Sequence, residues 1–194
     1  HRLYDPNEAT RISQSILLGA GGAKLLEVLG RETEIYHMNE GHALPLCFYL
    51  LDKFKSLEEV RKRVVFTTHT PEKAGNEEHN ITLLEKMSFF NGLTMKQVED
   101  YVYPENGTLN YTLTALRIAK KANGVSQLHG QVARDMWKDY KGICTIDGIT
   151  NAQNKTYWHD YMLDKALEKD DDAKLVSRKK MLKKKLFRVV ANQT

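Results

Sequence analysis

The sequence predicts an α/β fold: a Rossmann-like, three-layer parallel sheet with flanking helices, followed by a long basic helix at the C-terminal end. Short apolar runs alternate with segments of helical periodicity along residues 34–150. Several of these runs stop abruptly in polar residues, as in Glu34 to Ala43 and Val64 to Pro71. Such an ending is typical of the carboxyl end of a strand, where open α/β sheets bind ligands.

Bulk composition is that of an ordinary globular protein, with 41% apolar and 28% charged residues among 194. We expect no membrane partner, because no apolar run approaches the roughly 18 residues of a spanning helix. Cys47 and Cys144 lie in apolar contexts, which predicts buried free thiols in the cytoplasm, a reducing compartment. The sequence opens without Met, and we interpret it as a piece of a longer protein.

The first helix is expected from Glu8 to Leu29, with Gly30 as its C-cap. Gly19, Gly21 and Gly22 interrupt it, and each glycine costs roughly 1 kcal/mol relative to alanine. Close packing against a neighbouring helix is the favoured reason, and a backbone that approaches a ligand is the alternative. The spacing does not match a dinucleotide-binding fingerprint.

The remaining elements follow from periodicity, caps and turn residues. In order, we predict strand 34–38, loop 39–42, helix 43–55, a short helix 56–62, strand 63–67 and loop 68–71. Next come helix 76–90, a helix that starts at 94–99, a turn at 104–107, helix 109–122, strand 122–126, helix 127–140, strand 143–150, loop 151–156 and helix 158–167.

The last helix, Lys174 to Val190, is capped by acidic residues 170–172 and carries an apolar stripe: Leu175, Leu182, Leu186 and Val189. Residues 170–194 contain eight Lys/Arg and three Asp, so this segment accounts for the net charge of +4. A solvated amphipathic helix is favoured over binding to nucleic acid or a membrane. We predict two parts, a Rossmann-like part at 1–160 and terminal helices at 161–194.

Three polar loops are expected at strand ends: 39–42, 67–70 and 150–154. Their amide, carboxylate, imidazole and hydroxyl groups suit a sugar, whose hydroxyls both donate and accept hydrogen bonds. A metal site is the main rival, with potential ligands His37, Glu40, His42, His69 and His79. No HExxH spacing arises, and we expect no metal.

Several ordered motifs resemble the α-glucan (glycogen, starch, maltodextrin) phosphorylases. They are Arg2-Leu3-Tyr4, Arg11-Ile12-x-Gln14, Leu18-Gly19-x-Gly21-Gly22, His37 to Ala43, Phe66 to Pro71, Asn123 to Gly130 and Ile149-Thr150-Asn151. The resemblance covers most of residues 2–160, and it implies that the chain is an internal part of the N-terminal domain of a GT-B enzyme. Such a glycosyltransferase moves the terminal α-1,4-linked glucose of a glucan to phosphate, giving glucose 1-phosphate.

The resemblance further implies pyridoxal phosphate in the full-length enzyme, on a lysine of the C-terminal domain that has no match in this chain. The partners would be α-1,4-glucan and phosphate, without nucleic acid, and the full-length enzyme could be a homodimer. The chain alone would hold half an active site and is expected to be inactive. Two alternatives are a sugar-nucleotide-dependent glucan synthase and a non-catalytic glucan-binding module.

Few site residues carry over from the family. His69 matches the histidine whose main-chain carbonyl faces the transferred glucose, and it is the catalytic candidate. Asn39, Glu40, His42 and Thr70 match the polar pocket beside the sugar, and Asn151 matches an asparagine that binds a glucose hydroxyl. Two stretches depart from the family pattern, Glu72-Lys73 and Ala152-Gln153-Asn154.

Overall fold

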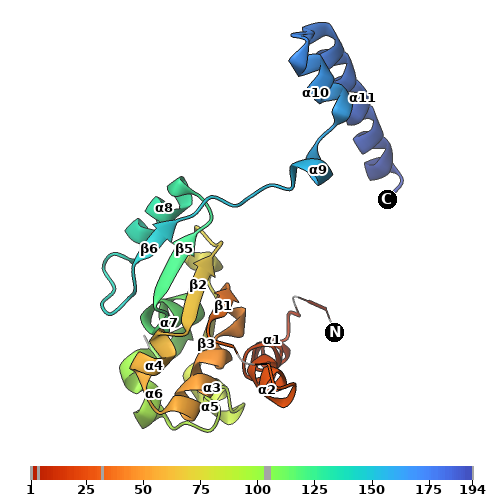
Figure 1. The fold of residues 1–194 in the computed structure, drawn as a ribbon. Coiled ribbons are helices and arrows are strands. Elements are labelled where there is room, and N and C mark those ends of the chain that lie inside the picture. The colour runs from red at the N-terminus through yellow and green to blue at the C-terminus, as the bar shows by residue number, and fades with distance from the viewer. Residues whose placement is uncertain (1, 4, 32, 103–105, 194) are drawn as a thin grey trace. The chain divides into compact units, whose positions relative to one another are not determined.

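The chain folds into two compact units, His1–Asn151 and Ala152–Thr194 (Figure 1). The computed structural model describes residues 2–3, 5–31, 33–102 and 106–193. Tyr4 of the first family motif and residues 104–105 of the predicted turn lie outside the described residues.

The first unit contains a four-stranded sheet in the order β1-β2-β5-β6. The strands are β1 Tyr36–Asn39, β2 Val64–Thr68, β5 Lys121–Gly124 and β6 Ile146–Gly148. All three pairings are parallel, and the register places Asn39 opposite Thr67 and Thr67 opposite Asn123. The predicted α/β class and parallel sheet are confirmed, although strand bounds shift by a few residues.

Burial alternates along β1, β5 and β6 and distinguishes two faces of the sheet, whereas Thr67 and Thr68 of β2 are both buried. Met38, Phe66, Ala122 and Ile146 are buried in the core. Helices α7 (Tyr111–Ile118) and α8 (Gln127–Trp137) contact β2, β5 and β6, and their core residues belong to the same apolar cluster. The other face carries the exposed side chains His37, Asn39, Lys121 and Asp147.

A small antiparallel sheet, β3 Glu78–Asn80 with β4 Thr108–Asn110, was missed by the sequence analysis. The predicted helices 76–90 and 109–122 are therefore wrong at their starts. The side chain of Asn80 accepts from the N–H groups of Thr82 and Leu83, and that of Asn110 accepts from Leu113. These N-caps begin α5 Ile81–Lys86 and α7 Tyr111–Ile118, which leaves the preceding residues free to pair as strands.

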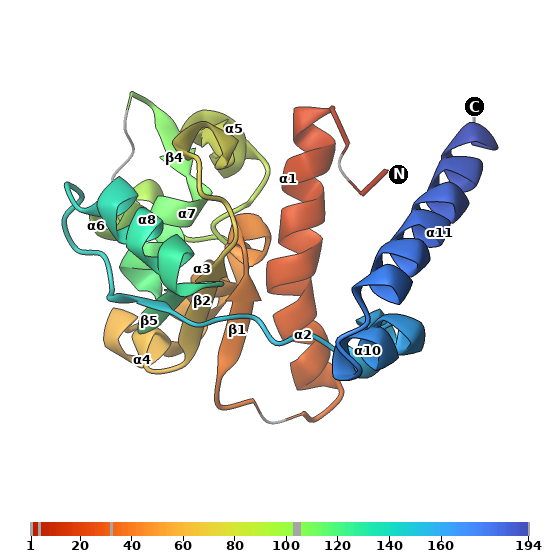
Figure 2. The ribbon, with the colours of Figure 1, turned by 90° about the horizontal axis from the view of Figure 1, so that it is seen from above.

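The first helix is continuous, and Figure 2 shows it as one rod. It consists of α1 Glu8–Ile16, a π-helical segment η1 Leu17–Gly21, and α2 Gly22–Val28. A Cβ atom on Gly19 would lie 2.6 Å from the carbonyl oxygen of Ala43 and 2.7 Å from the backbone nitrogen of Leu46. Close helix packing is therefore the reason for this glycine, as the sequence analysis favoured.

The other helices of the first unit pack around this frame. They are η2 Gly41–Ala43, α3 Pro45–Phe54, α4 Leu57–Arg61, η3 Lys73–Gly75, α6 Met95–Val102 and α8 Gln127–Trp137. The side chain of Ser56 accepts from the N–H of Glu59, so the predicted cap of α4 is confirmed. In the core, Phe48 of α3 stacks edge-on against Phe90, which follows α5, at a centroid distance of 4.9 Å.

The second unit contains α9 Lys155–Trp158, α10 Tyr161–Glu168 and α11 Asp172–Ala191. Asp160 caps α10 and forms an ion pair with Arg178 at 2.6 Å, so α10 starts three residues later than predicted. Asp171 accepts from the N–H of Lys174, which confirms the acidic cap of the last helix. In the parts of the chain that the structure describes, no helix is long and apolar enough to cross a membrane.

Candidate functional site

The candidate site lies at the carboxyl edge of the parallel sheet. Asn39 is the last residue of β1, and His69 and Thr70 directly follow β2. Because β1 and β2 are parallel neighbours, their two following loops leave the sheet at the same edge. Asn39 and His69 are exposed, whereas Glu40 and Thr70 are half-buried.

Glu40 joins these two loops. Its N–H donates to the carbonyl oxygen of Thr67 at 2.9 Å. Its carboxylate Oε1 accepts from the N–H of His69 and from the hydroxyl of Thr70, the latter at 3.1 Å. Glu40 has φ 65° and ψ 175°, a backbone conformation that glycine adopts readily and other residues rarely do.

His42 belongs to a second cluster behind the β1 loop. Its Nδ1 lies 3.3 Å from Oε2 of Glu77, and Arg11 donates from Nε to Oε1 of Glu77 at 2.9 Å. Burial favours a raised pKa for Glu77, but the hydrogen bonds from His42 and Arg11 prevail and lower its pKa to about 2. A cavity of about 230 Å³ adjoins this cluster and is lined in part by His42, Arg11 and Gln14.

A chain of hydrogen bonds crosses the second face of the sheet, which carries His37, from β1 to β5, where Thr67 is buried and Asn123 is half-buried. Oγ1 of Thr67 donates to Oδ1 of Asn123 at 2.7 Å and lies 2.7 Å from Nε2 of His37. Because a hydroxyl has only one proton, Nε2 of His37 must be the donor in the second bond. These bonds link β1, β2 and β5 next to the strand ends from which the loops of Asn39 and His69 leave.

Asn151 is placed differently from the other predicted site residues. It follows β6, which is separated from β2 by β5. Its side chain is exposed, while its N–H donates to the carbonyl oxygen of Val125 at 3.1 Å. None of the described residues hydrogen-bonds to its side-chain amide.

The structure thus brings together Asn39, Glu40, His69 and Thr70, with His42 bound to the adjoining Arg11–Glu77 pair. The sequence analysis did not identify Thr67, Asn123 and Glu77 as supporting residues. Arg11 occurred in a family motif, but Glu77 gave no signal because the two are 66 residues apart in the sequence. Among the described residues, no three His, Cys, Asp or Glu side chains converge on a common metal position.

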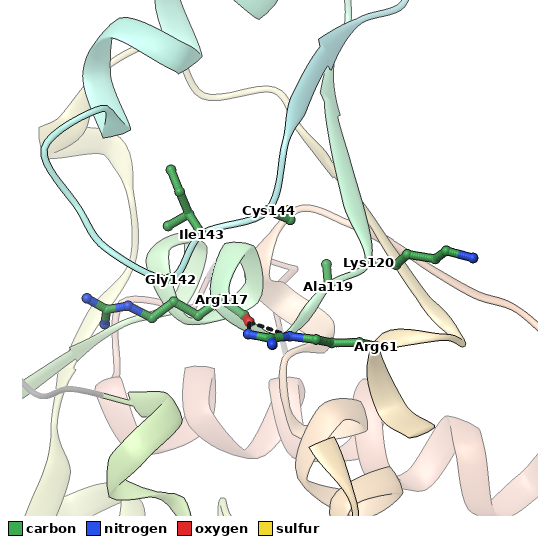
Figure 3. Close-up of a pocket in the computed structure, with 7 residues that line it drawn as sticks. All are labelled: Arg61, Arg117, Ala119, Lys120, Gly142, Ile143 and Cys144. Atoms are coloured by element: carbon green, nitrogen blue, oxygen red, sulfur yellow. Dashed lines mark hydrogen bonds between the residues drawn. The ribbon is translucent and has the colours of Figure 1, made fainter. Parts of the chain in front are cut away.

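A different cavity, of about 370 Å³, opens at the opposite edge of the sheet, before the starts of β2, β5 and β6. Its lining includes Arg61, Arg117, Lys120 and Cys144 (Figure 3). Burial raises the pKa of the Cys144 thiol to about 11, so the thiol is protonated near neutral pH. Burial likewise raises the pKa of the fully buried Cys47 to about 12.

This cationic cavity does not fit pyridoxal phosphate. An imine-forming lysine and the groups that bind the phosphate must converge on one ligand. Figure 3 shows the ammonium group of Lys120 and the guanidinium group of Arg117 pointing in opposite directions. The guanidinium groups are engaged elsewhere, since Arg61 donates to the carbonyl oxygen of Arg117 at 2.7 Å and Arg117 donates to that of Val102 at 3.1 Å.

The fold and the loops define an α/β protein with a Rossmann-like parallel sheet and a polar site at the carboxyl edge of that sheet. No protein-family model matches the chain. An uncharacterized protein of Methanocaldococcus jannaschii is 44% identical over the whole chain, which corresponds to 36% of that protein.

Two named relatives identify the family. Maltodextrin phosphorylase of Thermococcus litoralis is 34% identical over 80% of the chain, and glycogen phosphorylase of Aquifex aeolicus is 35% identical over 81%. The chain spans only 20% and 25% of the length of these two enzymes. The resemblance to part of the α-glucan phosphorylase family is therefore confirmed.

Proposed function

We propose that the protein to which this chain belongs is an α-glucan phosphorylase, a glycosyltransferase that moves the terminal α-1,4-linked glucose of a glucan to phosphate and releases glucose 1-phosphate. The observation that carries the proposal is the pair of hydrogen bonds that the Glu40 carboxylate accepts from His69 and Thr70. These bonds hold the two polar loops together at the carboxyl edge of the sheet. The similarity to maltodextrin and glycogen phosphorylases supports the reaction class.

In this proposal, the chain provides one wall of the glucose pocket. No described donor bonds to the carbonyl oxygen of His69, so that oxygen is available to a ligand. Facing the transferred glucose, it would stabilise the positive charge that develops on the sugar in an oxocarbenium-like transition state. Asn39, Thr70, His42 and Asn151 would exchange hydrogen bonds with sugar hydroxyls.

The opposite wall would come from outside this chain. Pyridoxal phosphate would be bound there, on a lysine of the C-terminal domain, and would supply a phosphate group that assists proton transfer. The chain alone would bind glucan without turning it over. The cytoplasmic location and a homodimeric whole enzyme remain predictions.

Two measurements test this function. In the first, the ¹⁵N-labelled chain is titrated with maltoheptaose, with ADP-glucose as the comparison ligand. We expect maltoheptaose to shift the amide signals of residues 39–42 and 69–70. No shift with maltoheptaose would contradict a glucan-binding wall.

In the second, the longer protein is assayed with maltoheptaose and inorganic phosphate, and separately with maltoheptaose and ADP-glucose. We expect glucose 1-phosphate from the first mixture and no chain elongation in the second. Elongation with ADP-glucose alone would favour a glucan synthase. Glucan binding without either reaction would favour a non-catalytic binding module.

A further inference from the structure

We propose that Glu40 is a positioning residue, which holds the His69–Thr70 segment in the conformation that receives the sugar. This inference rests on the proposed function for its link to the sugar, and on the geometry alone for its link to the loop. The sequence analysis placed Glu40 among the residues that contact substrate. Its contacts in the structure assign it a role toward the second loop instead.

The contacts of Glu40 run mainly to one segment. Its N–H is bonded to the carbonyl oxygen of Thr67 at 2.9 Å, and Oε1 accepts from both His69 N–H and Thr70 Oγ1. These three bonds bracket residues 67–70, the end of β2 and the start of its loop. The bond from His69 N–H fixes the peptide plane between Thr68 and His69, and the bond from Thr70 Oγ1 holds the residue that follows, so the carbonyl group of His69 lies between two anchored groups.

The backbone at Glu40 shows that the side chain matters at this position. A φ of 65° with a ψ of 175° suits glycine, and Gly41 comes directly after it. A glutamate there carries a conformational cost that its surroundings must offset, and such costs concentrate at functional sites. The carboxylate bonds to the second loop are the compensating interactions that this structure offers.

The two oxygens of the carboxylate are used unequally. Oε1 accepts two hydrogen bonds, whereas Oε2 accepts none from a donor in the described ranges. Both donors, an amide N–H and a hydroxyl, are neutral. The amide oxygen of a glutamine would accept the same two bonds, so the positioning role requires an oxygen acceptor and no charge.

The test compares Glu40→Gln, Glu40→Ala and Glu40→Gly in the whole 194-residue chain. Glu72→Ala is the matched control, because Glu72 is an exposed glutamate of the same loop region whose backbone is extended, with φ −124°. Two quantities are measured: the hydrogen exchange rate of the His69 amide, and the affinity for maltoheptaose. Glu40→Gly is informative because it relieves the backbone conformation while removing the carboxylate.

We expect the His69 amide to exchange about tenfold faster in Glu40→Ala and Glu40→Gly, since one protecting hydrogen bond is lost. The affinity for maltoheptaose should fall by a similar factor. Glu40→Gln and Glu72→Ala should stay within about threefold of the unaltered chain in both quantities.

Unchanged His69 exchange in Glu40→Gly would overturn the positioning role. So would a loss of affinity in Glu40→Gln as large as in Glu40→Ala, because that result requires the charge itself to meet the sugar. If the unaltered chain does not bind maltoheptaose, the proposed function fails, while the exchange rates still decide whether Glu40 holds the second loop.

Discussion

The loops that follow β1 and β2 are held by side chains, whereas the loop that follows β6 is held mainly by the backbone. Glu40 and His42, both in the loop after β1, bind residues 69–70 of the loop after β2 and Glu77, respectively. After β6, Ile149 N–H donates to Gly124 and Asn151 N–H donates to Val125, at 2.9 and 3.1 Å. One part of the candidate site is therefore fixed by specific side chains, and the other follows from strand pairing.

This difference predicts which substitutions should change the conformation of the loops. Changes to the side chains that bond the β1 and β2 loops to each other should disturb the wall that these loops form. Changes to side chains after β6 should leave the conformation of that loop intact. Three predictions test this contrast, from the largest expected effect to the smallest.

The largest effect is expected where the first helix supports the β1 loop. Gly19→Ala places a methyl group within 2.6 Å of the Ala43 backbone, and we expect it to lower the free energy of unfolding by about 3 kcal/mol. Gly22→Ala is the control, since no atom within 4 Å opposes a Cβ there. It should stabilise the chain by about 0.5 to 1 kcal/mol, because alanine favours a helix more than glycine does.

Urea denaturation at one pH and temperature measures both variants. Equal effects of Gly19→Ala and Gly22→Ala would show that the first helix does not depend on close contact with the β1 loop. The prediction that the first helix supports this wall would then be wrong.

The Glu77 carboxylate should make stability depend on pH. Its pKa of about 2 in the folded chain lies below the value of 4.5 for a free glutamate, so its contribution is complete above pH 4.5 and is lost as the pH falls toward 2. The lowered pKa corresponds to about 3 kcal/mol, and because the Glu77 carboxylate is only partly buried, solvent screening reduces its contribution to about 2 kcal/mol. Glu77→Gln should therefore be less stable than the unaltered chain at pH 7, and the difference should shrink on acidification.

The free energy of unfolding from pH 7 to pH 2.5 measures this contribution. Glu78→Gln is a suitable control, because the neighbouring Glu78 is exposed. A stability difference between Glu77→Gln and the unaltered chain that stays constant across this range would contradict the role of the His42–Glu77–Arg11 cluster.

A smaller effect is expected along the second face of the sheet. Thr67→Val removes the hydroxyl that links His37 to Asn123 and should cost about 1 to 2 kcal/mol, since both partners lose a bond. Asn151→Ala, in the loop after β6, should change stability by less than about 0.5 kcal/mol, because its side chain is exposed. Thermal unfolding of the two variants compares the end of β2 with the loop after β6, and an Asn151→Ala variant as unstable as Thr67→Val would contradict the contrast.

Periodicity and strand-end polarity were enough to predict the parallel sheet and two of the polar loops at its carboxyl edge. Apolar runs such as Val64 to Phe66 identify buried strands whatever lies around them, and their ends identify the ligand edge. The β3–β4 pair was not predictable in the same way. Those strands are three residues long, and Asn80 and Asn110 are both strand ends and helix caps.

The contacts that support the candidate site were even less predictable from the sequence. Glu77 meets Arg11 across 66 residues, and only the folded chain reveals that pairing. Glu40 was identified as a polar site residue, but the direction of its carboxylate depends on an unusual backbone angle that no local pattern of residues specifies. Residue types at strand ends predicted the place of the site, while its internal bonds required the structure.

The last prediction concerns direct contact with the sugar, and it tests the central claim that the β1 and β2 loops form one glucose-binding wall. The measurement is a set of isotope-filtered nuclear Overhauser effects between maltoheptaose and the labelled chain. We predict contacts from the protons of one terminal glucose to Asn39, His69 and Thr70 in the same complex. Contacts confined to the cavity at Arg61 and Lys120, or to helices α10 and α11, would contradict the account.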